Sequence, residues 1–165
     1  MSRSCTIAIV GGFQRGKSTL VNALLGRDIA EMGRGLSTTH ENREYSLSPA
    51  VSIIDTPGFN ANEGDDGTAA SAIDKADIVL YVHESKALGD ACPVLFAKTK
   101  ERRKHIIFLL NCCDFDKWAP SENEEIVSTI EAELHTKRIL SSVLPLSGRI
   151  VYPLNVLWAR FSRKA

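Results

Sequence analysis

The sequence predicts an α/β fold in three layers, in which a mostly parallel six-stranded sheet carries helices on both faces. Short apolar runs rich in Val, Ile and Leu alternate with longer helix-like stretches along the whole chain. Strands that alternate with helices in this way pair in parallel through right-handed crossovers. A chain of 165 residues can also bury a core of its own. We therefore expect one domain, residues 1–165, which is either complete or part of a longer protein.

Six runs have the length and composition of strands. Five of them are apolar enough to be covered on both faces: Cys5–Val10, Val51–Asp55, Ile78–His83, His105–Asn111 and Ser142–Leu146. The sixth, Glu44–Ser48, is separated from Val51–Asp55 by a short turn at residues 48–50. Because so short a connection joins antiparallel neighbours, we expect one antiparallel strand beside an otherwise parallel sheet.

About five helices are expected between these strands: Lys17–Leu25, Thr68–Lys75, Cys92–Arg103, Glu122–Thr136 and Leu154–Arg163. Ser121 with Glu124 forms a capping box before the fourth, and Pro153 stands where the fifth would begin. Two loops rich in Gly and Asp, residues 33–39 and 58–67, follow the first helix and the third strand. Ligands bind at that edge of open α/β sheets.

The charge balance and the cysteines narrow the class of protein. Twenty basic residues match twenty acidic ones, so no net field draws the chain to nucleic acid or to an anionic membrane. No apolar run is long enough to span a membrane. The four cysteines lack zinc-type spacing and are expected to be free thiols. We therefore expect a cytoplasmic domain with neither a nucleic-acid nor a membrane partner.

The strongest chemical signal is the run GGFQRGKS at residues 11–18, which matches G-x-x-x-x-G-K-[ST] in full. A strand runs into it and a helix leaves it, so its backbone N–H groups and the helix N-terminus can cradle phosphates. Lys17 is expected to reach the β- and γ-phosphates and to act in catalysis, and Ser18 to ligate Mg²⁺. The other nucleotide contacts expected here are Gly12, Phe13, Gln14, Arg15, Gly16 and Thr19. The alternative is an ordinary glycine turn.

A second motif, Asp55-Thr56-Pro57-Gly58, stands at the end of an apolar strand. Asp55 is expected to hold Mg²⁺, usually through a water molecule. Gly58 has no side chain to block its N–H from the γ-phosphate, so it is a catalytic candidate. Without the preceding phosphate loop the same four residues would be only a turn.

At Asn111-Cys112-Cys113-Asp114 the chain resembles the Ras-like and translation-factor-related P-loop GTPases, whose guanine-reading motif is N-K-x-D. The Asp114 carboxylate can accept hydrogen bonds from guanine N1–H and its exocyclic amine, whereas adenine would leave a buried charge unpaired. Asn111 matches the motif, and Cys112 replaces its lysine, which implies weaker nucleotide binding. The alternative is a polar loop.

Less specific sequence motifs extend this resemblance over nearly the whole chain. Thr38 and Thr39 follow Ser18 by 20 and 21 residues, the spacing of the Era-like and tRNA-modification-type GTPases. The resemblance implies that one of them, which we take as Thr39, ligates Mg²⁺ and closes on the γ-phosphate. The first helix has the S-x-L-x-N-x-L-x-G pattern of that branch, and there is some likeness to dynamin-like domains. The segment Ser147-Gly148-Arg149 resembles the S-A-K motif and would contact guanine after the last strand.

Two positions depart from these families. Ras-like GTPases have a water-orienting glutamine after the D-x-x-G glycine, whereas this chain has Phe59. Many Era-like proteins have a P-loop asparagine that helps to bind K⁺, and Gln14 stands at that position, which leaves a K⁺ cofactor open. Arg15 could contact phosphates in cis or across a dimer, although a solvated loop residue is the plainer interpretation.

These features predict a three-layer P-loop NTPase of the Ras-like type that binds GTP or GDP with Mg²⁺. We expect slow GTP hydrolysis, stimulated by a protein effector or by a nucleotide-dependent second copy, with loops 33–44 and 58–68 ordered by GTP. One alternative is a nucleotide-binding regulatory module with negligible hydrolysis. Another is a P-loop ATPase.

Overall fold

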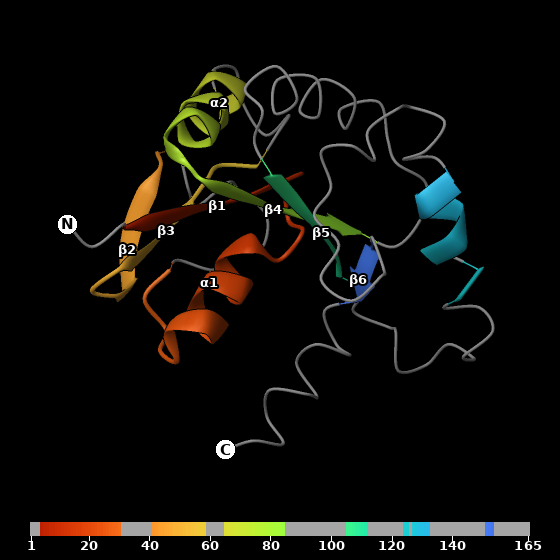
Figure 1. Ribbon diagram of the computed structural model, residues 1–165, viewed down its shortest axis with the longest axis horizontal. Helices are drawn as coiled ribbons and strands as arrows, with labels where there is room; N and C mark the ends of the chain where they lie inside the picture. Colours follow the sequence, from red (N-terminus) through yellow and green to blue (C-terminus); the bar gives the residue numbers. More distant parts are fainter. Residues whose placement is uncertain are drawn as a thin grey trace.

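The structure, a computed structural model, describes residues 4–30, 41–58, 65–84, 105–111, 124–125, 127–132 and 151–153. The strands among these residues form one six-stranded sheet with the spatial order β2-β3-β1-β4-β5-β6 (Figure 1). The strands are β1 (Cys5–Gly11), β2 (Arg43–Ser48), β3 (Val51–Asp55), β4 (Ile78–Glu84), β5 (His105–Asn111) and β6 (Val151–Pro153). All neighbouring strands are parallel except β2 and β3.

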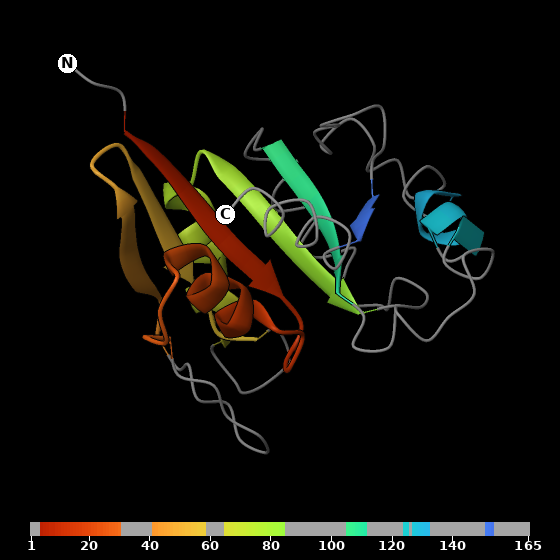
Figure 2. The same cartoon turned by 90° about the horizontal axis from the view of Figure 1, so that it is seen from below.

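Two helices lie on opposite faces of this sheet. Helix α1 (Lys17–Leu25) covers one face and α2 (Asp65–Lys75) the other, as Figures 1 and 2 both show. The core beneath α1 is formed by Ile9, Leu20, Val21, Ala30, Ile53, Val82 and Leu109. On α2 the fully buried residues recur at helical spacing: Ala69, Ala72, Ile73 and, just past the helix, Ala76. Each helix therefore buries one apolar side against the sheet.

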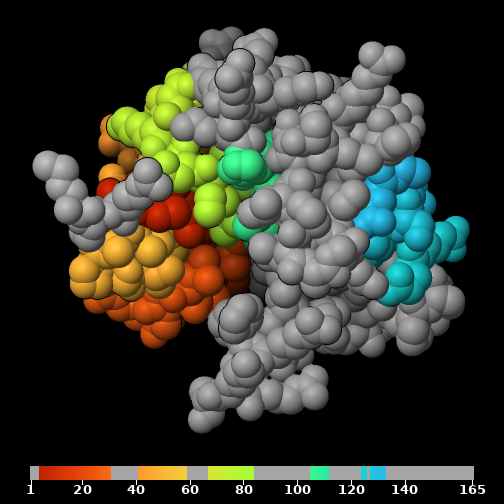
Figure 3. All heavy atoms as spheres, viewed as in Figure 1, coloured from red at the N-terminus to blue at the C-terminus, as the bar shows by residue number. Residues whose placement is uncertain are grey.

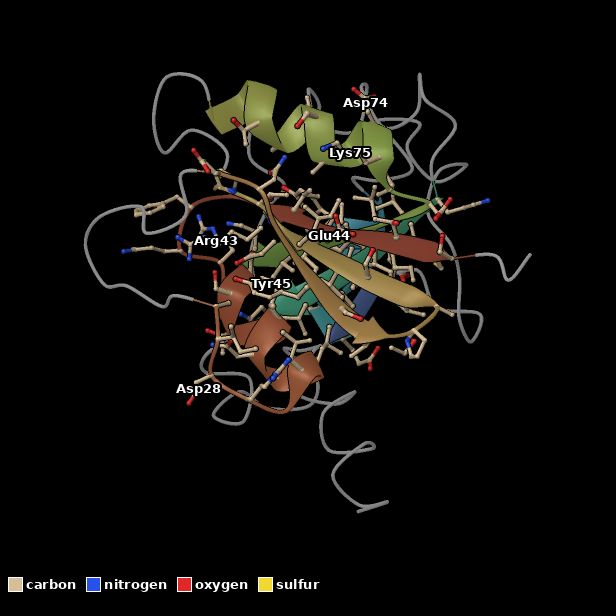
Figure 4. All side chains as sticks on the ribbon, turned by 90° about the vertical axis from the view of Figure 1, so that its left-hand side faces the viewer. Asp28, Arg43, Glu44, Tyr45, Asp74 and Lys75 are labelled. Atoms are coloured by element: carbon tan, nitrogen blue, oxygen red, sulfur yellow. The ribbon has the colours of Figure 1, made fainter. Side chains whose placement is uncertain are left out.

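Strand β2 is the edge of the sheet, and its side chains are largely exposed. Figure 4 looks onto this edge, with Arg43, Glu44 and Tyr45 along β2, between α2 with Asp74 and Lys75 and the chain after α1 at Asp28. In the space-filling view of Figure 3 the β2–β3 hairpin, in orange and gold, forms part of the surface at the left. The edge therefore lies between the two helical layers.

The predicted fold class is confirmed: the sheet is mostly parallel and has one antiparallel pair. The bounds of α1, β3 and β5 are those expected, whereas α2 begins three residues before the predicted Thr68. Residues 124–125 and 127–132 are helical, within the predicted helix Glu122–Thr136. The predicted helices Cys92–Arg103 and Leu154–Arg163 lie outside the described residues.

The structure contains one strand, β6, that the sequence did not predict. The strand paired with β5 is β6, with Pro153 aligned to Leu110, whereas Ser142–Leu146 lies outside the described residues. A run as short as Val-Tyr-Pro gives a weak strand signal, and proline is tolerated there because β6 stands at the edge of the described sheet. The segment 147–149 therefore precedes the last strand of this sheet instead of following it.

Within the residues that the structure describes, no helix is long and apolar enough to cross a membrane.

Candidate functional site

The glycine-rich run leaves β1 at the carboxyl edge of the sheet and turns directly into α1. Its backbone is curled: Gln14 and Gly16 have φ angles of 55° and 84°. A Cβ on Gly11 would collide with the carbonyl of Val82, and one on Gly16 would collide with the side-chain amide of Asn111. The two glycines are therefore required by close backbone approach, which is the property that a phosphate-binding loop needs.

Lys17 is the first residue of α1 and is only 7% exposed. Its Nζ donates a 2.9 Å hydrogen bond to the carbonyl oxygen of Gly12, so the side chain lies back along the loop. The side chain of Arg15 also folds over Gly12, since a Cβ built there would lie 3.4 Å from its Cγ and Nε. The positively charged side chains of Lys17 and Arg15 therefore both lie against the phosphate loop at Gly12.

Ser18 and Asp55 meet where α1 approaches the end of β3. The hydroxyl of Ser18 donates a 2.8 Å hydrogen bond to Oδ2 of Asp55, which is only 1% exposed. The other oxygen, Oδ1, is buried and has no hydrogen-bond partner in the described part of the chain. Burial raises the pKa of this carboxyl group, against the opposing effects of the Ser18 hydrogen bond and the Lys17 charge.

This pair of groups suits a magnesium ion. Mg²⁺ takes oxygen ligands, usually one or two carboxylates or hydroxyls with water and phosphate completing its shell. The Ser18 hydroxyl, the adjacent Asp55 carboxylate and its unpaired Oδ1 supply that chemistry. The residues present therefore fit the ion that the sequence predicts.

The segment after β3 is held against the phosphate loop. The buried hydroxyl of Thr56 donates a 2.9 Å hydrogen bond to the carbonyl of Ile9 in β1. A Cβ on Gly58 would lie 2.5 Å from Cα and 2.8 Å from N of Phe13. Gly58 thus lies directly on the loop backbone.

Asn111, at the end of β5, also contacts the loop. Its Nδ2 donates a 2.8 Å hydrogen bond to the carbonyl of Arg15, 96 residues earlier. The sequence pattern assigned Asn111 to the nucleotide, whereas the structure places its amide on the protein that holds the phosphates. The residue therefore ties the predicted guanine-reading segment to the phosphate loop.

Asn22 makes buried hydrogen bonds that the sequence did not predict, because its position in the first helix was interpreted as part of the core. It is 5% exposed, its Nδ2 donates to the carbonyl of Ala30, and its Oδ1 accepts from the N–H groups of Ile29 and Ala30. It therefore fixes the chain that leaves α1. An asparagine inside an apolar helical pattern was the available signal, because buried amides need partners.

Several predicted site residues lie outside the described residues: Thr38, Thr39, Phe59, Cys112, Asp114, Ser147, Gly148 and Arg149. Their roles stay predictions. Thr19 and Gln14 are placed and exposed, on α1 and on the loop before it.

A curled glycine loop between a parallel strand and a helix, with a buried lysine and a serine facing a strand-end aspartate, defines a P-loop nucleoside-triphosphate-binding domain. The sequence model of the 50S ribosome-binding GTPases matches residues 6–112, which is more than half of the chain. The chain belongs to this family. The expected enzyme class, a GTPase, is thereby confirmed, and the Era relatives and Era structures described next confirm the expected Era-like branch.

Curated relatives agree with this assignment. The chain is 29% identical over 156 residues to GTPase Era of Actinobacillus pleuropneumoniae serotype 5b, covering 87% of this chain and 48% of that protein. It is 31% identical over 156 residues to GTPase Era of Marinobacter nauticus, covering 89% of this chain and 50% of that protein. The chain thus spans about half the length of the curated relatives it matches.

Solved structures share the fold. Era from Aquifex aeolicus bound to GDP and AlF4⁻ has a TM-score of 0.70 at 19% identity, covering 98% of this chain and 56% of that one. Era in complex with MgGDPNP and nucleotides 1506–1542 of 16S ribosomal RNA has a TM-score of 0.69 at 22% identity, covering 99% and 57%. At these identities the likeness establishes the fold alone.

The second of these structures corrects one expectation. From the neutral charge balance we expected no nucleic-acid partner, yet a protein of this fold is seen in complex with ribosomal RNA. A net charge of +0 averages over one stretch of chain and does not describe local patches or the remainder of a longer relative. The charge balance was therefore no basis for excluding RNA.

Proposed function

We propose that this chain binds GTP with Mg²⁺ and hydrolyses it slowly, as a switch that a partner or a second copy accelerates. The observation that carries the proposal is the Ser18–Asp55 pair, with a spare buried carboxylate oxygen, directly beside the buried Lys17. Family membership supports the choice of GTP as the nucleotide.

In this proposal Ser18, Asp55 and Thr39 hold the magnesium ion, which neutralises charge on the phosphates. Lys17, aligned along the loop by Gly12, binds the β- and γ-phosphate oxygens. Gly58 presents its N–H to the γ-phosphate, and its position against Phe13 supports that assignment. The chain's own contribution is thus positioning and electrostatic stabilisation, which account for most of the catalysis in phosphoryl transfer.

Guanine is read by Asp114 in this proposal, and Asn111 positions the segment that carries it. The bond from Asn111 to Arg15 supports this, because the base-reading and phosphate-binding segments then move together. Cys112 lacks the aliphatic stem of the usual lysine, so we expect weaker nucleotide affinity than in relatives that have it. The segment 147–149 is a weaker candidate for the guanine contact, because it precedes β6.

Slow hydrolysis follows from Phe59, which cannot hydrogen-bond the attacking water. A switch GTPase without help turns over on the order of 10⁻⁴ to 10⁻² s⁻¹. The same residue favours a second candidate function, a guanine-nucleotide-binding regulatory module with negligible turnover.

Single-turnover phosphate release from GTP distinguishes the two functions. It is measured over a protein dilution series, with and without 16S ribosomal RNA and ribosomes, because an Era complex contains that RNA. The proposed switch predicts a slow basal rate that rises with protein concentration or with one of these additions. Absence of turnover in every condition would favour the regulatory module, and fast turnover independent of concentration would refute the switch.

A further inference from the structure

Asn42, the residue before β2, is hydrogen-bonded to helix α2. Its Nδ2 donates to the carbonyl of Thr68 at 2.7 Å and to the hydroxyl of Ser71 at 2.9 Å. The Ser71 hydroxyl in turn donates to the same Thr68 carbonyl at 2.8 Å. Figure 4 shows α2 above the β2 edge whose first residue, Arg43, is labelled. One amide thus joins the start of the edge strand to the middle of the helix.

The carbonyl oxygen of the Asn42 side-chain amide makes no hydrogen bond within the described residues. Oδ1 of Asn42 is buried and has no partner in the part of the chain that the structure describes. An unpaired buried carbonyl is unfavourable, and such a group in a native fold calls for an explanation.

The next residue, Arg43, is the strand partner of the predicted magnesium ligand Asp55. It is aligned with Asp55 across the β2–β3 pair, and its positive charge favours the ionised carboxylate. Asn42 bonds to α2 on one face of the sheet, whereas Arg43 is paired with Asp55, which accepts a hydrogen bond from Ser18 of α1 on the other face. We name these two residues the β2 junction. The junction therefore connects α2 on one face with the predicted Mg²⁺ ligand on the other.

The junction also lies close in sequence to both γ-phosphate contacts. Asn42 is three residues after Thr39, and Thr68 is ten residues after Gly58. Asn42 belongs to one of the two loops expected to be ordered by GTP, residues 33–44, and Thr68 is the last residue of the other, residues 58–68. The Asn42–α2 bonds thus join the ends of these two loops.

We propose that Asn42 is a positioning residue whose amide joins β2 to α2 in the GTP-bound arrangement and so raises the preference of this chain for GTP over GDP. The inference rests on the proposed function. Coupling of this kind is reciprocal: if GTP favours the Asn42–α2 contact, the contact must favour GTP by the same factor. A contact with equal strength in both nucleotide states would shift nothing.

The test compares the affinities of fluorescent GDP and of a non-hydrolysable GTP analogue for the wild type and Asn42→Ala. Loss of the two hydrogen bonds should weaken the GTP analogue by about two- to tenfold and leave GDP within about twofold. The matched control is Ser46→Ala, which removes an exposed hydroxyl of β2 that donates to the nearby Ser48 carbonyl. It should change neither affinity.

Ser71→Ala provides a second route, because Ser71 is exposed and its loss should not disturb folding. A double-mutant cycle with Asn42→Ala should give a coupling with the GTP analogue and none with GDP. Equal changes for both nucleotides, or strictly additive effects in both, would show that Asn42 is merely structural. A wild type that binds neither nucleotide would instead refute the proposed function and this inference with it.

Discussion

The phosphate loop and the β2 junction flank the same strand, β3, but they are held by different kinds of contact. The loop is closed by backbone positions where any side chain would collide, and by a buried Ser18–Asp55 bond of 2.8 Å. The junction depends on one half-buried amide whose oxygen has no partner among the described residues. Each region also has one buried oxygen without a partner among the described residues, Oδ1 of Asp55 beside the loop and Oδ1 of Asn42 at the junction. The comparison therefore separates a cradle fixed by close backbone contacts from a connection made by a single side-chain amide.

The largest effect is expected for Lys17→Ala, which removes the buried ammonium group of the cradle. Loss of charge-assisted hydrogen bonds to phosphate should weaken GDP and GTP alike, by about 10- to 100-fold. Titration with fluorescent nucleotides measures this, with Lys75→Ala, an exposed lysine at the end of α2, as the control. If GDP affinity survived Lys17→Ala, the cradle would not be the phosphate site.

Asp55→Asn separates magnesium binding from stability. We expect Mg²⁺-dependent nucleotide affinity to fall by about 10- to 100-fold, the range for disturbed metal sites. Stability of the nucleotide-free protein should rise or stay unchanged at neutral pH, because burial disfavours the charged carboxylate. Thermal unfolding with EDTA, and nucleotide titration with Mg²⁺, measure the two effects.

The raised pKa of Asp55 also sets a pH dependence. Because its folded pKa lies above its unfolded value, protonation stabilises the fold at low pH, and that contribution is lost as pH rises through the folded pKa. Mg²⁺ needs the ionised form, so Mg²⁺-dependent affinity should fall as pH drops through the same pKa. Asp55→Asn should remove both dependences, and an unaltered pH profile in this variant would contradict the assignment.

A smaller effect is expected for Gly58→Ala, which tests the contact between the end of the β3 segment and the cradle. The new Cβ would lie 2.5 Å from Phe13 Cα, so the two backbones must separate. We expect about a tenfold loss of affinity for the GTP analogue, with GDP little changed. Gly67→Ala on α2, where a Cβ meets no atom within 4 Å, is the matched control. It should raise the melting temperature, because alanine is the better helix former.

The parts that the sequence predicted well are those in which neighbours in the chain are neighbours in space. The strand, loop and helix around Lys17 form one contiguous motif, so their bounds and their phosphate-binding chemistry could be predicted together. The bond from Asn111 to Arg15 spans 96 residues, and the one from Asn42 to Thr68 spans 26. No local pattern contains such contacts. Strand β6 was not predicted because three residues with a proline carry too little periodicity.

The central claim, that this P-loop domain is a guanine-nucleotide switch, is tested most directly by the base preference of the wild type and Asp114→Asn. GDP, ADP and xanthosine diphosphate are titrated against both proteins with Mg²⁺ present. We predict that the wild type prefers GDP strongly to ADP, and that Asp114→Asn loses GDP and gains the xanthosine nucleotide. Equal affinity of the wild type for ADP and GDP, or unchanged GDP affinity in Asp114→Asn, would contradict the claim.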